Sequence, residues 1–130
     1  MQKTFTLAIL LVLVFTSCSK TNDLASQLTG KWNMVRVVIN GESADQMLNP
    51  DGNRWLAFQP TGNFTSGSGK ERENGGTYEL DPTKAEVFLD SDAGEGDDSR
   101  WQVSFSGDTL FMRGVGTARQ ESSLVTLLKE

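Results

Sequence analysis

Two features of this 130-residue chain could do chemistry: its single cysteine, Cys18, and an acidic segment over 90–98. The sequence contains no histidine, which is the commonest general base and metal ligand in proteins. Serine, threonine, lysine, carboxylates and one tyrosine remain, without a recognisable nucleophile motif. We therefore expect a protein that is not an enzyme.

The acidic segment carries five carboxylates within nine residues, and Gly94 and Gly96 loosen the backbone between them. Hard cations such as Ca²⁺ bind several oxygen ligands at once, so the segment is a weak calcium candidate. Its spacing departs from the EF-hand loop, because the fifth position falls on Gly94 and the twelfth on Trp101. We favour a solvated acidic loop without metal. The carboxylates in question are Asp90, Asp92, Glu95, Asp97 and Asp98.

The N-terminus has the arrangement of a secretory signal. A basic start, with Lys3, precedes the apolar run 5–15, in which only Thr6 is polar. This run is shorter than the roughly 20 residues that a membrane-spanning helix needs. An ordinary signal cleaved nearby would leave Cys18 as an unpaired, reactive thiol.

The four residues Phe15-Thr16-Ser17-Cys18 resemble the lipobox of bacterial lipoproteins, with Phe15 where leucine is usual. The resemblance implies that residues 1–17 are a signal peptide and that Cys18 is lipidated, with acyl chains such as palmitate that anchor the protein in a membrane. Ser19 resembles the residue that directs such proteins to the outer membrane. We expect a lipid-anchored protein of the bacterial envelope, with residues 18–27 as a flexible polar tether.

The charge distribution excludes nucleic acid as an expected partner. The chain has 12 basic and 17 acidic side chains, for a formal net charge of −5, and its basic residues are scattered singly. Binding to phosphates needs clustered positive charge. Since there is one cysteine, no disulfide can form within the domain over 28–130. Packing alone must stabilise it.

The rest of the chain consists of short strand-like runs separated by turn signals such as Asn40-Gly41. Apolar residues recur at every second position, as at Val87 and Leu89, which is typical of half-buried strands. The loop 41–53 is the longest early loop and is the expected lid of the barrel mouth. Within it, residues 44–48 could form a single helical turn, and no other helix is expected. We predict an all-β fold, an antiparallel meander of about eight strands that closes into a barrel. The expected strands are 32–40, 54–59, 63–68, 75–80, 85–90, 100–105, 109–113 and 122–129.

Gly30-Lys31-Trp32 carries the Gly-x-Trp signature of lipocalin-like proteins. The order of turns behind it also resembles the short lipocalin-like domains of bacterial lipoproteins. In lipocalins this tryptophan closes one end of the barrel and stacks against a basic side chain of the last strand. The resemblance implies structural roles for Gly30 and Trp32. It makes Lys129 the expected partner of Trp32, with Arg119 as the other candidate.

The function we expect is the binding of a small hydrophobic or amphipathic ligand in the barrel mouth, without a cofactor. The alternative is a filled barrel that contacts a protein partner through its loops. An open apolar cavity would favour the ligand, whereas dense packing would favour the partner. The sequence names neither. The candidate ligand-binding residues are Arg54, Trp55, Phe64, Tyr78, Trp101 and Met47.

Overall fold

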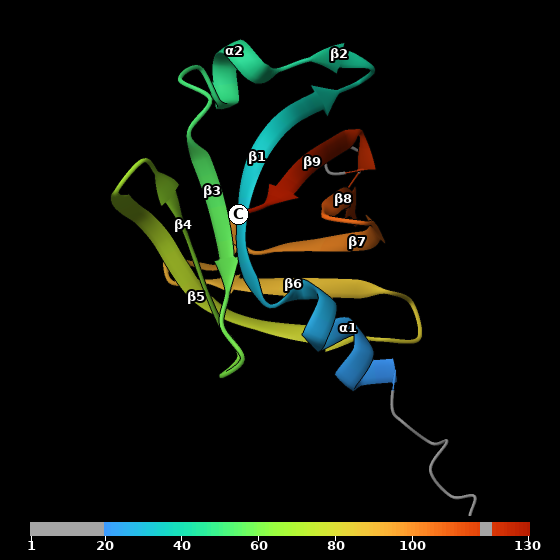
Figure 1. The fold of residues 1–130 in the computed structure, drawn as a ribbon. Helices are drawn as coiled ribbons and strands as arrows, with labels where there is room; N and C mark the ends of the chain where they lie inside the picture. The colour runs from blue at the N-terminus through green and yellow to red at the C-terminus, as the bar shows by residue number, and fades with distance from the viewer. Residues whose placement is uncertain (1–19, 118–120) are drawn as a thin grey trace, which may run out of the picture.

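The computed structural model describes residues 20–117 and 121–130, so the expected signal peptide, Cys18 and Arg119 lie outside the described residues. Eight strands form an antiparallel barrel in which each strand pairs with the next and the last pairs with the first (Figure 1). The predicted all-β fold and its closure are confirmed. The barrel strands are β1 (Gly30–Ile39), β3 (Arg54–Phe58), β4 (Asn63–Ser68), β5 (Glu71–Asp81), β6 (Glu86–Ser91), β7 (Ser99–Ser106), β8 (Thr109–Val115) and β9 (Ser123–Lys129).

Closure depends on β1, which is hydrogen-bonded along both of its edges. Its first residues pair with β3, from Gly30 opposite Phe58 onward, and almost its whole length pairs with β9. A bulge between Met34 and Arg36 interrupts the β9 ladder, and such a bulge increases the local twist of a strand. The added twist allows β1 to form hydrogen bonds with both β3 and β9. The short strand β2 (Glu42–Ser43) pairs with the far end of β1 and lies outside the ring.

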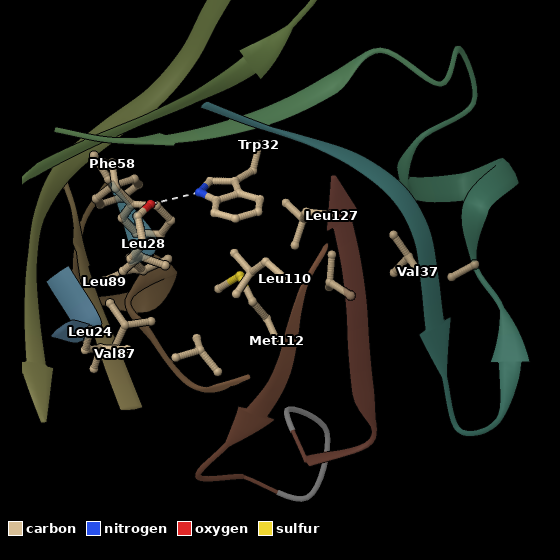
Figure 2. Packing of buried hydrophobic residues seen from close by; sticks show 14 residues of the cluster. Leu24, Leu28, Trp32, Val37, Phe58, Val87, Leu89, Leu110, Met112 and Leu127 are labelled. Atoms are coloured by element: carbon tan, nitrogen blue, oxygen red, sulfur yellow. Dashed lines mark hydrogen bonds between the residues drawn. The ribbon is translucent and has the colours of Figure 1, made fainter. Parts of the chain in front are cut away.

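The core fills one end of the barrel. Trp32, Phe58, Leu110 and Leu127 are almost completely buried there, as members of one hydrophobic cluster (Figure 2). Each of these residues occupies an inward position of its strand, because side chains alternate between the two faces of a sheet. The first helix covers the same end, since its Leu28 has no exposed surface.

That helix, α1 (Lys20–Leu28), corrects the expectation of a flexible tether for residues 20–27, whereas residues 18 and 19 lie outside the described residues. Leu24 and Leu28 lie four residues apart, hence on one face of the helix, and both are buried against the barrel. Thr29 extends the contact, because its Oγ1 donates a hydrogen bond of 2.7 Å to the carbonyl oxygen of Ala25. Two leucines among polar residues are too weak a pattern to predict a helix from the sequence. The helix is stabilised instead by packing of these leucines against the core of the barrel.

Two short helical turns complete the fold. The turn α2 (Asp45–Leu48) matches the single turn expected at 44–48, and it lies at the end of the barrel opposite α1 (Figure 1). A 3₁₀ turn, η2 (Glu95–Asp97), lies within the acidic segment between β6 and β7. No helix in the described ranges is both long enough and apolar enough to cross a membrane.

If α1 is part of the core, replacing Leu28 by alanine will destabilise the whole domain. We expect Leu28→Ala to lower the free energy of unfolding in urea by about 2–5 kcal/mol, the usual cost of removing a buried leucine side chain. The matched control is Gln27→Ala on the exposed face of α1, expected to change stability by less than about 0.5 kcal/mol. Equal stability of both variants and the parent would show that α1 is not part of the cooperative unit.

Candidate functional site

The end of the barrel beside α1 is closed by Trp32, which is 1% exposed. Its indole Nε1 donates a hydrogen bond of 2.8 Å to the carbonyl oxygen of Leu28, drawn as a dashed line in Figure 2. Lys129 Nζ lies 5.4 Å from the centroid of the same indole, and the ring of Phe105 packs at 6.1 Å. These contacts surround the indole of Trp32 at this end of the barrel. Trp32 therefore has a structural position, with Lys129 beside it.

Gly30 allows that arrangement through its backbone conformation. Its φ of +131° lies in a region that side-chain-bearing residues rarely adopt. A Cβ at this position would also lie 3.1 Å from Cε of Lys129, the side chain that covers the indole of Trp32. Glycine at residue 30 thus keeps the closed end compact.

Tyr78 belongs to the closed end as well, and it is not among the residues that line the cavity described below. Its hydroxyl donates a hydrogen bond of 2.7 Å to the carbonyl oxygen of Gln59, and its ring meets that of Phe58 edge-on at 5.1 Å. Burial raises the pKa of the Tyr78 hydroxyl, and a hydrogen bond with Thr29 opposes that shift in part. Tyr78 was expected in the mouth, but it supports the floor.

The other half of the barrel is hollow. A cavity of about 330 Å³ lies between the strands, with an apolar wall and a polar rim. The apolar wall includes Leu56, Phe64, Leu89, Trp101, Met112 and Val125. The polar rim consists of Arg54, Ser66, Asn74, Ser91, Asp97 and Ser99.

The cavity opens at the end of the barrel away from Trp32. An outer hollow of about 680 Å³ shares Arg54, Ser66, Asn74 and Asp97 with the cavity and adds Trp55 and Glu73. Arg54 begins β3, whereas Phe58 at the end of that strand pairs with Gly30 beside the floor. The barrel therefore has a filled floor and an open mouth.

The side chain of Arg54 crosses part of the mouth. Its Nη2 lies 3.0 Å from Oε1 of Glu73, and its Nη1 donates a hydrogen bond of 3.2 Å to the carbonyl oxygen of Leu48. The buried side chain of Asn49 fixes the same loop, because Nδ2 donates to the carbonyl oxygen of Met34 at 2.9 Å and Oδ1 accepts from the Arg54 backbone at 3.1 Å. The loop that we expected to act as a lid is thus attached to β1 and β3.

The acidic segment forms the opposite side of the mouth. Oδ2 of Asp97 accepts hydrogen bonds from Nδ2 of Asn74 at 2.8 Å and from Oγ of Ser91 at 2.9 Å. Oδ1 of Asp98 accepts from the backbone N–H of Ser91 at 2.8 Å. Ser91 is buried, so it ties this loop to the inside of the barrel.

The five carboxylates of the segment do not converge. Asp97 and Asp98 bind separate groups, and Asp92 forms an ion pair of 3.6 Å with Arg72. Asp90 and Glu95 are exposed to solvent. Among the residues that the structure describes, no group of three or more acidic residues could hold a metal ion. The geometry gives no support to the calcium alternative.

The cavity contains three of the six ligand-binding candidates, Arg54, Phe64 and Trp101. Trp55 faces the outer hollow, where its Nε1 donates to the carbonyl oxygen of Gly69 at 2.9 Å. Met47 is 76% exposed on α2 and does not line the cavity.

Several polar rim residues were missed by sequence reasoning. Ser66 lies in a run that offered little for packing, and Asn74 and Ser91 carried no motif. Inward positions within β4, β5 and β6 place them at one end of the barrel. Their only sequence signal was alternation with inward apolar residues, as between Phe64 and Ser66.

Comparison with known proteins supports the fold. No protein-family model matches the chain, and no curated protein does. The chain is similar to the crystal structure of a DUF4847 family protein from Bacteroides vulgatus, with a TM-score of 0.57 and 13% identity, over 79% of this chain and 94% of that one. At this level of identity the likeness is one of fold. Function must be argued from the cavity.

The raised pKa of Tyr78 makes a pH-dependent prediction. This is the only tyrosine of the chain, so phenolate absorbance reports on it alone, and we expect a midpoint above 10.0 in the folded protein. The folded state then holds the proton to higher pH than the unfolded state. The stabilisation from the neutral hydroxyl is full below about pH 10 and is lost as pH rises through the folded pKa.

Tyr78→Phe removes this titration, so urea unfolding midpoints of parent and variant are compared between about pH 8 and pH 11. The advantage of the parent over the variant should shrink toward the higher pH. A folded-state midpoint at or below that of the protein in urea would contradict the burial of this hydroxyl.

Proposed function

We propose that this protein binds a small amphipathic ligand without chemical conversion, with the apolar part of the ligand inside the barrel and its polar group at the mouth. The observation that carries the proposal is the cavity of about 330 Å³, apolar within and open at one end. This volume falls in the range of about 300–1,000 Å³ that is usual for small-molecule sites. It is several times the ~30 Å³ that one water occupies in the liquid.

The lining also supports a ligand over a filled barrel. Toward the floor, the large side chains of Trp32 and Phe58 are almost fully buried in the interior. Toward the mouth, small inward residues such as Ser66 and Ser99 leave space between the apolar walls. Transfer of an apolar group from water to such a space is favourable, and the rim offers polar partners to a group that remains near solvent.

We further propose that acylated Cys18 holds the barrel on a membrane of the bacterial envelope, the outer membrane being the expected one. The support is the lipobox resemblance over 15–18. Helix α1 begins two residues after Cys18 and packs at the closed end. An anchor at Cys18 therefore puts the floor of the barrel toward the lipid and turns the mouth toward the aqueous side.

Filling the cavity tests the ligand proposal. We expect the parent barrel, starting at Ser19, to bind the neutral fluorescent probe N-phenyl-1-naphthylamine saturably, and Ser66→Phe to weaken that binding by about tenfold or more because the ring occupies the cavity. Thr65→Phe is the matched control, since residue 65 points outward in the same strand. Equal probe binding by Ser66→Phe and Thr65→Phe, or no saturable binding by the parent, would contradict the proposal.

The anchor is tested with the full chain expressed in a bacterium. We expect Cys18→Ser to move the protein from the membrane fraction to the soluble fraction, because serine cannot carry the thioether-linked lipid. Mass spectrometry of the N-terminal peptide should show acyl chains in the parent and in the control Thr21→Ser. Membrane retention of Cys18→Ser would refute the anchor.

A further inference from the structure

The charges that the described residues bring to the mouth do not cancel. Three charged side chains from residues 20–117 and 121–130 line the cavity and the outer hollow, namely Arg54, Glu73 and Asp97. The guanidinium of Arg54 is already engaged, since Glu73 lies 3.0 Å away and the carbonyl oxygen of Leu48 accepts its other hydrogen bond. An anionic ligand could reach Arg54 only by displacing Glu73, so the cation that the described residues place at the mouth is not free to receive it.

The ion pair between Arg54 and Glu73 leaves the carboxylate of Asp97 without a cationic partner among the described residues. Its hydrogen-bond partners, Asn74 and Ser91, are both neutral. No ion pair within the described ranges involves Asp97. The two neutral donors hold the carboxylate in place at the rim without balancing its charge. Two further carboxylates, those of Glu95 and Asp98, lie in the same loop. Among the residues that the structure describes, the lining of the mouth therefore carries a net negative charge.

Trp101 adds a second feature that favours a cation. Its indole lines the cavity, and its Nε1 already donates a hydrogen bond of 2.8 Å to Oγ of Ser99. Because its N–H group is engaged, what the side chain has left for a ligand is the aromatic ring. The faces of tryptophan rings attract ammonium groups, and sites for quaternary amines are built from such rings.

We propose that the polar group of the ligand is a cation, so that the barrel binds amphipathic amines in preference to fatty acids or other anionic lipids. This inference rests on the proposed function and specifies its ligand class. The apolar part of the amine occupies the wall formed by Leu56, Phe64 and Leu89. Its ammonium group lies at the rim, near the Asp97 carboxylate.

The test is competition for the neutral probe by three amphiphiles with the same ten-carbon chain, used below their micelle concentrations at neutral pH and low salt. Decyltrimethylammonium is cationic, decanol is neutral and decanoate is anionic. We expect decyltrimethylammonium to displace N-phenyl-1-naphthylamine at concentrations lower than decanoate by about tenfold or more. Added salt should narrow that difference, because it screens exposed charges.

Two substitutions at the mouth test whether its charged residues cause the preference for the cation. Asp97→Asn keeps an oxygen acceptor for Asn74 and Ser91 while removing the charge, so it should reduce the preference for the cation. Glu73→Gln releases Arg54 from its ion pair and should strengthen binding of decanoate. The matched control is Glu79→Gln, which removes one negative charge from an exposed position of β5 outside the cavity and should leave the preference unchanged.

The outcomes separate this inference from the proposed function. Binding of decanoate as tightly as decyltrimethylammonium would overturn the preference for amines while leaving a ligand-binding barrel. An equal effect of Glu79→Gln and Asp97→Asn would overturn the assignment to the mouth. Saturable probe binding that no amphiphile displaces would also overturn the amine proposal. Absence of saturable probe binding by the parent would overturn the proposed function itself.

Discussion

The pairing of β1 with β9 is the contact on which the rest of this structure depends. It joins the first and last strands of the meander, so the sheet has an inside and an outside and the barrel strands lose their free edges. The same register sets Trp32 opposite Lys129, which brings an ammonium over the indole at the closed end. With one cysteine in the whole chain, this ladder and the core beneath it replace any disulfide.

The two ends of the barrel are built by different physical means. The floor is held by close packing of large apolar groups, with single hydrogen bonds that satisfy the indole of Trp32 and the hydroxyl of Tyr78. The mouth is held by polar contacts instead, through Asn49 on one side and Ser91 on the other. A rim made rigid by side-chain amides and hydroxyls can stay open, because its polar groups have partners in the absence of a ligand.

A fold shared with a DUF4847 family protein leaves the function of this chain to its own cavity. Barrels of this kind serve unrelated ligands, since the sheet fixes only which positions face inward. Here those positions combine an apolar wall with a polar rim. In that rim Arg54 forms an ion pair with Glu73, whereas the partners of Asp97 among the described residues are neutral. Helix α1 covers the floor of the barrel. Cys18 precedes this helix by two residues in the sequence, so the proposed lipid anchor is attached on the floor side.

The sequence by itself determined the eight strands of the barrel and their order. Alternation of apolar residues and the turn signals predicted all eight barrel strands, with β4 at its observed bounds, and local sterics are sufficient for that. Helix α1 could not be predicted, since Leu24 and Leu28 become a stabilising pair only against a core. Only the tertiary structure decided which side chains meet at the mouth. Ser66, Asn74 and Asp97 come from separate segments, and the register of the closed sheet brings them to one end, whereas it places Tyr78 at the other.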